Sequence, residues 1–207
     1  MGNIIEKPSA AEIERCLKIW DESPEYEKYR HQEKSVVMLF REQYPKNTIL
    51  EEVLIKACVL NDFYGTLIRN VYSVALNIVK QNIDESLANA DVGIVDKIAR
   101  VTINGKEIRF YSFATKYCSQ HRPDVFPIYD SFVDKVLVHF RNEDKFYEFK
   151  NEKLRCYETF NNVILEFRKF YKLEQFSLKQ LDQYLWTIGK ENFSTPKKDA
   201  DLKTIKQ

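Results

Sequence analysis

The sequence predicts an all-α fold, a single helical domain of about eight to ten helices with one short β-hairpin inserted in it. Apolar residues recur at helical spacing in nearly every segment of the 207-residue chain. Only five glycines and six prolines interrupt a composition that is 44% apolar and 14% aromatic. Because a sheet with many tight turns needs more turn residues than this, the composition favours helices packed around a core.

The N-terminal segment predicts two helices that begin at capping residues. Ser9 is followed three residues later by Glu12, which is the pattern of a capping box at the start of a helix. A second helix is expected to begin at Ser23, with Pro24 in its first turn. It is expected to end at Pro45, because proline has no backbone N–H to continue a helix.

The next segment predicts two longer helices and two short ones. The third helix is expected to begin near Asn47 or Thr48, where Thr48 and Glu51 can form a second capping box. The fourth helix is expected over residues 66–81, with Leu67 on its apolar face. Asp84 and Asp91 are then expected to cap the two short helices.

The helical pattern changes at VTINGKEIRF, residues 101–110. Asn104 and Gly105 separate two short β-prone arms, and this pair is the strongest short-range signature of a two-residue hairpin turn. Beyond the hairpin, helices are expected over residues 111–120, from Asp130 onward, over residues 152–171, and from Ser177 to Gly189.

No linker, internal repeat or low-complexity segment divides the chain, so one domain is expected over residues 1–207. Within it, residues 1–60 form the N-terminal helices and residues 61–193 form a second helical region. Residues 194–207, with several lysines, are expected to be a solvated, flexible tail.

Composition and motifs argue against several functions. The 32 basic and 31 acidic residues leave a net charge of +1, so any DNA-binding surface must be local. No glycine-rich phosphate-binding motif is present, so no nucleotide cofactor is expected. No segment approaches the roughly 20 apolar residues that a membrane span requires, so we expect no membrane association and a cytoplasmic location.

Metal binding is not expected either. His121 follows Cys118 at a ligand-like spacing, but His31 and His139 lie in separate helical contexts. The four cysteines are roughly forty or more residues apart, a spacing that suggests neither a zinc site nor a disulfide framework. They are expected to be reduced and mostly buried.

Two stretches resemble the helix-hairpin-helix DNA glycosylases. FYSFATKYCSQHRPDVFPIYDSFVDKVL, residues 110–137, is similar to the segment in which a helix, a proline-containing loop and an acidic residue form the active site. LKQLDQYLWTIGKENF, residues 178–193, resembles the closing helix of the compact 8-oxoguanine DNA glycosylase/lyases. VLNDFYGTLIRNVY, residues 59–72, is more weakly similar to the early helix that lines the base pocket. The resemblance implies a glycosylase-like fold.

It also implies roles for particular residues. Asp130 takes the position of the essential acid. Asn61, Asp182, Tyr184 and Trp186 fall in the segments that line the base pocket.

Two features of that family are missing. Ser112 falls where lyase-competent members carry a nucleophilic lysine. Ile108 and Phe110 fall where hairpin glycines let backbone N–H groups approach a DNA phosphate. Lys116 lies on the same helical face as Ser112, so it is a displaced nucleophile, a solvated surface group or a group that contacts the DNA backbone.

The hairpin turn offers a substitute for the missing glycines. Asn104, Gly105 and Lys106 could present backbone donors and one positive charge to a DNA phosphate.

The resemblance therefore implies a DNA-binding protein of base excision repair that hydrolyses the N-glycosidic bond of a damaged or modified base without lyase activity. Asp130 would stabilise positive charge on the sugar and activate water. The alternative is a catalytically inactive helical module for DNA binding or interaction, in which Asp130 only caps a helix and the aromatic residues only fill the core. A cavity beside Asp130 with basic groups around it would favour the enzyme.

Overall fold

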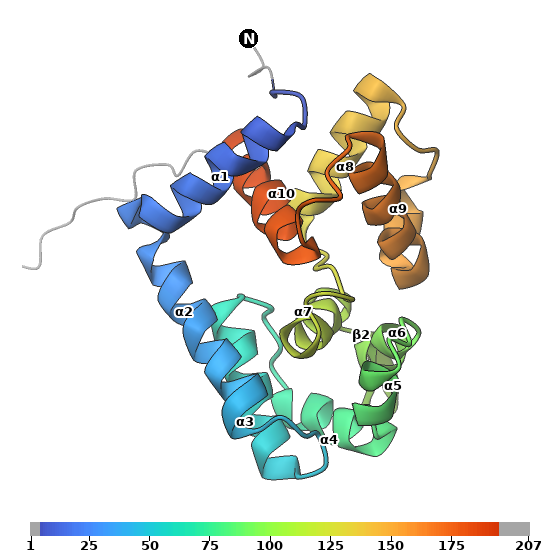
Figure 1. Ribbon diagram of the computed structural model, residues 1–207. Helices are drawn as coiled ribbons and strands as arrows, with labels where there is room; N and C mark the ends of the chain where they lie inside the picture. Colours follow the sequence, from blue (N-terminus) through green and yellow to red (C-terminus); the bar gives the residue numbers. More distant parts are fainter. Residues whose placement is uncertain (1–4, 195–207) are drawn as a thin grey trace, which may run out of the picture.

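Ten α-helices and one two-stranded hairpin form residues 5–194, the part of the chain that the computed structural model describes (Figure 1). The predicted all-α class is therefore confirmed. Its glycosylase-like arrangement remains a prediction. Except for Ser194, the expected tail lies outside the described residues.

The first helix begins as the sequence indicates. α1 covers Ala10–Glu22, and the Ser9 hydroxyl accepts a hydrogen bond from the backbone N–H of Glu12. Ile13 and Cys16 point from this helix into the core, where both side chains are buried.

The second predicted helix is divided into three segments of different helical pitch. A 3-10 turn, η1 (Pro24–Tyr26), precedes α2 (Glu27–Val37), and a π-helical segment, η2 (Met38–Gln43), follows it. Ser23 caps the first segment by accepting from the N–H of Glu25. The boundaries at Ser23 and Pro45 were therefore predicted correctly, but the uniform pitch between them was not.

The third helix lacks its expected capping box. α3 covers Leu50–Phe63, and its N-cap residue is Ile49, whose side chain cannot accept a hydrogen bond. The prediction that Thr48 caps this helix is therefore wrong. The start of α3 depends on tertiary packing of its buried face, which includes Val53, Ala57 and Leu60.

The fourth helix begins five residues later than predicted. α4 covers Val71–Gln81, and Asn70 caps it by accepting from the N–H of Ser73. Residues 66–70 stay outside the helix because the Asn61 side chain hydrogen-bonds to Thr66 and to the backbone of residue 68.

The two short helices also begin differently from the prediction. α5 (Asp84–Ala88) has Asp84 as its first residue rather than its cap, and the Asp84 carboxylate accepts instead from the backbone and side chain of Asn47. α6 covers Ile94–Ala99, and Asp91 accepts from the backbone N–H of Gly93 just before it.

The β-hairpin lies where the sequence predicts it. β1 (Arg100–Ile103) pairs antiparallel with β2 (Lys106–Arg109), and the two strands are joined by two residues. Asn104 and Gly105 have φ angles of 50° and 74°, the left-handed values that a type I′ turn requires at both positions.

The C-terminal half contains four α-helices and a 3-10 turn: α7 (Tyr111–His121), α8 (Ser131–Asp144), η3 (Asn151–Arg155), α9 (Tyr157–Phe170) and α10 (Leu178–Phe193). Asp130 and Ser177 cap α8 and α10 as predicted. Gly189 does not end α10. A Cβ added there would lie 2.6 Å from the Cβ of Phe132, so the glycine lets α10 approach α8 closely.

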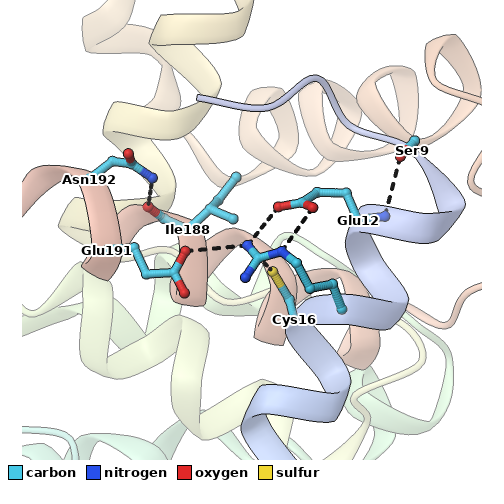
Figure 2. Close-up of polar contacts among 7 residues, drawn as sticks. Ser9, Glu12, Cys16, Ile188, Glu191 and Asn192 are labelled. Atoms are coloured by element: carbon cyan, nitrogen blue, oxygen red, sulfur yellow. Dashed lines mark hydrogen bonds and ion pairs between the residues drawn. The ribbon is translucent and has the colours of Figure 1, made fainter. Parts of the chain in front are cut away.

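The two ends of the described chain pack together. α1 lies against α10, and α10 lies against α8 (Figure 1). Arg15 on α1 pairs with Glu12 at 2.6 Å and with Glu191 on α10 at 3.4 Å. In Figure 2, Glu12 and Cys16 on α1 face Glu191 on α10. This contact holds α1 against α10.

Candidate active site

A cavity of about 610 Å³ lies between helices from both ends of the chain. α1, α2, the end of α3, α7, the start of α8 and α10 all contribute to its wall. Much of the wall is aromatic, formed by Trp20, Tyr29, Phe63, Tyr64, Tyr129, Phe132 and Trp186. Its polar side chains include Glu33, Ser112, Lys116, Asp130, Lys179 and Asp182. Such a volume and such walls suit a flat, polar ligand that stacks against rings.

Lys116 is the most enclosed cation of this wall. Its residue is only 5% exposed, and its Nζ donates to the Ser112 Oγ over 2.6 Å. The Ser112 hydroxyl donates in turn to the Tyr129 carbonyl oxygen over 3.2 Å. The amine is therefore hydrogen-bonded to Ser112, the residue for which the sequence resemblance predicts the position of the glycosylase lysine.

The environment of Lys116 makes its amine easier to deprotonate than that of an ordinary lysine. Burial lowers the pKa of the amine, while the nearby carboxylates of Asp130 and Asp182 partly oppose that effect. No carboxylate is paired directly with Lys116 among the described residues. A neutral amine is a nucleophile, whereas an ammonium group is not.

Asp130 caps a helix and faces the cavity at the same time. Its Oδ1 accepts from the backbone N–H groups of Phe132 and Val133, over 2.8 Å and 2.9 Å. Its Oδ2 makes no hydrogen bond within residues 5–194, and the residue is part of the cavity wall. The capping and the functional interpretations of Asp130 are therefore compatible.

A second carboxylate, Asp182, belongs to a charged group on the α10 side. Burial raises the pKa of Asp182 to about 7, although Lys179 acts in the opposite direction. The Lys179 Nζ pairs with the Glu33 Oε1 on α2 over 2.6 Å. Burial opposes the charge of Lys179, but Tyr64, Glu33 and Asp182 outweigh burial and raise its pKa. Asp182 can therefore exchange a proton near neutral pH.

Helical spacing accounts for the grouping of Asp182 and Trp186. The two residues are four apart on α10 and so share one helical face, which forms part of the cavity wall. Trp186 also contacts Trp20 of α1 edge to face, with ring centroids 5.7 Å apart. Both residues were predicted for the base pocket, and both line the cavity.

Two residues predicted for the pocket lie elsewhere. Tyr184 is two positions from both Asp182 and Trp186, so it points to the other side of α10 and is fully buried in the core. Asn61 is not part of the cavity wall, because its side-chain amide is hydrogen-bonded to Thr66 and to the backbone of residue 68.

The residues predicted to contact the DNA backbone lie in two different places. Lys116 lies in the cavity wall and is buried, so it is not a solvated surface group, and its contact with a DNA phosphate remains a prediction. Asn104, Gly105 and Lys106 form the exposed tip of the hairpin and do not line the cavity. Their predicted contact with DNA remains a prediction.

Sequence reasoning missed Glu33, Lys179 and Arg155. Lys179 could have been found, because it precedes Asp182 by three residues and therefore lies near the same helical face. Glu33 had no local signal, since only the packing of α2 near α10 brings it to Lys179. Arg155 lies in η3, which the sequence predicted as ordinary α-helix.

A smaller cavity of about 310 Å³ adjoins the first. The two share Ser112, Tyr129 and Arg155, and the smaller one also includes Thr66 and Arg109. Arg109 pairs with Asp96 and stacks over the ring of Tyr111 at 4.5 Å. Cationic side chains therefore stand beside the larger cavity.

The sequence also made predictions about the histidines, the cysteines and the apolar helices. In residues 5–194, no group of three or more His, Cys, Asp or Glu side chains is placed to hold a metal ion. His121 lies instead 3.2 Å from the Asn47 Oδ1. Cys16 and Cys118 are buried as expected, but Cys58 and Cys156 are exposed. None of the described helices is long and apolar enough to cross a membrane.

The fold and the cavity define an all-α protein with an aromatic, charged pocket. Residues 12–125 match the family HI_0787_N, described as an N-terminal domain. An uncharacterized protein of Haemophilus influenzae is 43% identical over 152 residues, which cover 73% of this chain and 73% of that protein. The chain belongs to this family. No solved structure matches it.

Proposed function

We propose that this protein binds DNA and excises a base that is turned out of the duplex into the 610 Å³ cavity. The observation that carries the proposal is the placement of one enclosed amine, that of Lys116, in an aromatic cavity that also holds Asp130. An extruded base needs flat apolar walls for stacking, and the bond to its sugar needs a nucleophile and a carboxylate.

Lys116 supplies the nucleophile in this proposal. Its neutral amine attacks C1′ of the sugar, the bond from C1′ to the base breaks, and the bonding electron pair leaves with the base. The attacking nitrogen loses a proton and the departing base gains one, for which Asp182, with a pKa of about 7, is a suitable carrier. Asp130 stabilises the positive charge that develops on the sugar.

This mechanism differs from the hydrolysis that the missing lysine suggested. Ser112 takes the position of that lysine, but the amine four residues further along the helix reaches the serine hydroxyl. Opening of the sugar ring would then convert the covalent adduct into a Schiff base, and lyase chemistry could follow.

The test is reductive trapping on a panel of duplexes, each with one damaged or modified base or an abasic site. We expect borohydride to trap a covalent adduct with at least one duplex. Lys116→Gln should reduce trapping and excision by about a hundredfold or more, because a carboxamide cannot form a Schiff base. Lys80→Gln, at an exposed position on α4, is the matched control and should behave like the parent protein.

The pH dependence provides a second readout of the same site. Because burial lowers the pKa of Lys116, trapping with cyanoborohydride should increase with pH and reach half its maximum below the ordinary lysine value of 10.5. Excision without any trapped adduct would instead favour water activated by Asp130. DNA binding without excision of any base would favour the non-catalytic module.

A further inference from the structure

Leu67 has two unusual properties for a leucine. Its side chain is 87% exposed, the largest value among the exposed large hydrophobic residues in the described part of the chain. Its backbone has φ of 58°, in the left-handed region that residues with a Cβ seldom adopt. Both properties are unfavourable in the free protein.

Hydrogen bonds with Asn61 fix the residues on both sides of Leu67. On one side, the Thr66 hydroxyl donates to the Asn61 Oδ1 over 2.8 Å. On the other, the Ile68 backbone N–H donates to the same oxygen over 2.9 Å, and its carbonyl accepts from the Asn61 Nδ2 over 3.1 Å. The Ile68 side chain is only 4% exposed. Leu67 therefore lies between two residues, Thr66 and Ile68, whose positions are fixed by hydrogen bonds to Asn61.

The same loop forms part of the wall of both cavities. Phe63, Tyr64 and Gly65 line the larger cavity, and Thr66 lines the smaller one. Leu67 follows immediately after them. It therefore projects into solvent one residue beyond the wall of the smaller cavity and two residues beyond the wall of the larger cavity, which we assign to an extruded base.

We propose that Leu67 is an apolar wedge that enters the base stack of duplex DNA when a nucleotide turns out into the larger cavity. The inference rests on the proposed function, because the wedge acts only if a base is extruded. An extruded base leaves a gap between its neighbours, and an apolar side chain can fill that gap and slow the return of the base.

The surroundings of Leu67 favour DNA over a protein partner. Leu67 is one apolar side chain between Thr66 and Ile68, with the exposed residues Arg69 and Asn70 next along the chain. Arg109 and Arg155 line the smaller cavity beside the loop. Within residues 66–70, Leu67 is the one exposed apolar side chain and has polar neighbours. This arrangement suits a base step with phosphates on both sides, whereas a stable protein interface needs a broader apolar patch.

The test compares Leu67→Ala with Leu165→Ala, which shortens another exposed leucine on α9. The probe is a duplex with 2-aminopurine in a mismatched pair, whose fluorescence rises when the base leaves the stack. The parent protein and Leu165→Ala should both raise the fluorescence. Leu67→Ala should lose most of this rise and bind the duplex about tenfold more weakly. Leu67→Phe should restore both, because another apolar side chain fills the gap.

Single-stranded DNA of the same sequence separates this inference from the proposed function. Leu67→Ala should bind the single strand as the parent does, because no gap in a stack needs filling. If Leu67→Ala raises the duplex fluorescence as strongly as the parent, the wedge is wrong and the proposed function stands. If the parent protein neither binds these DNAs nor raises the fluorescence, both proposals are wrong.

Discussion

Two polar side chains of the cavity wall also take part in the hydrogen bonding of the local backbone. The Oδ1 of Asp130 caps α8, while its Oδ2 is left for the cavity within the described residues. Ser112 likewise accepts from Lys116 and donates to a backbone carbonyl. A cap or a hydrogen bond therefore does not argue against a functional role at these positions.

Asp130→Asn should separate DNA binding from excision. Asparagine keeps the shape and can still accept from the two backbone N–H groups, so the free energy of unfolding should fall by no more than about 1 kcal/mol. DNA affinity should hold or increase slightly, because one negative charge near phosphate is lost. Excision should fall by roughly a hundredfold or more, because the negative charge that stabilises the sugar in the proposed mechanism is removed.

The measurement is single-turnover excision beside a binding titration at fixed salt. Unchanged excision in Asp130→Asn would mean that the carboxylate is only a cap. In that case, the role assigned to Asp130 in the mechanism would be wrong.

At the scale of elements, the position of each helix depends on close contacts that the local pattern does not reveal. Gly189 lies within α10 and allows the backbone of that helix to approach Phe132 at the start of α8. Phe132 and Trp186 both line the cavity, so the spacing of these two helices also sets the shape of the site.

Gly189→Ala should therefore destabilise the protein, although alanine is the better helix former. Helix propensity alone would raise the free energy of unfolding by about 1 kcal/mol. The added Cβ would lie 2.6 Å from the Phe132 Cβ, so the two helices must move apart, and overpacking of this kind costs about 1–3 kcal/mol. Thermal and denaturant unfolding measure the net effect. An increase in stability would show that α8 and α10 adjust without cost.

At the scale of the whole molecule, one buried polar network joins elements that are distant in sequence. The Asn47 Oδ1 accepts from the Lys56 Nζ on α3 over 2.7 Å and from the Tyr117 hydroxyl on α7 over 2.6 Å. The Asn47 Nδ2 donates to the Asp84 carboxylate on α5 over 2.6 Å. The His121 Nε2 lies 3.2 Å from the Asn47 Oδ1. The network connects three helices around the segment that follows η2.

This network should make the protein sensitive to acid. Burial, together with the nearby charges of Lys56 and Arg41, lowers the pKa of His121 from 6.5 to about 3. The unfolded chain therefore binds a proton below about pH 6.5 that the folded chain does not bind until about pH 3. The stability that depends on neutral His121 is fully present above pH 6.5 and is lost as the pH falls toward 3.

His121→Gln should remove this dependence. In the parent protein, His121 should make the free energy of unfolding decrease by about 1 kcal/mol per pH unit across that window. The variant should show a shallower slope, because glutamine does not titrate. His31→Gln is the control, since that histidine is exposed on α2. Equal slopes in the parent protein and His121→Gln, measured by denaturant titrations from pH 7 to pH 4, would contradict the prediction.

Local sequence signals were sufficient for the features that depend on neighbouring residues. The caps at Ser9, Asp130 and Ser177 satisfy N–H groups two or three residues away, so their residue types reveal them. The turn at Asn104 and Gly105 depends on the left-handed backbone of two residues, and it too was predicted correctly. The all-α class follows in the same way from apolar periodicity along each helix.

Tertiary structure alone decided the features that need contacts between distant segments. The sequence placed Leu67 on the apolar face of a helix, but the Asn61 side chain keeps residues 66–70 out of that helix. The sequence also left the role of Lys116 open. Only the packing of the other helices around α7 placed its amine in the cavity wall. The pairing of Glu33 with Lys179 joins residues 146 positions apart. The reason is physical: periodicity and caps report the energies of neighbouring residues, whereas burial, pKa and cavity shape depend on what the rest of the chain packs against.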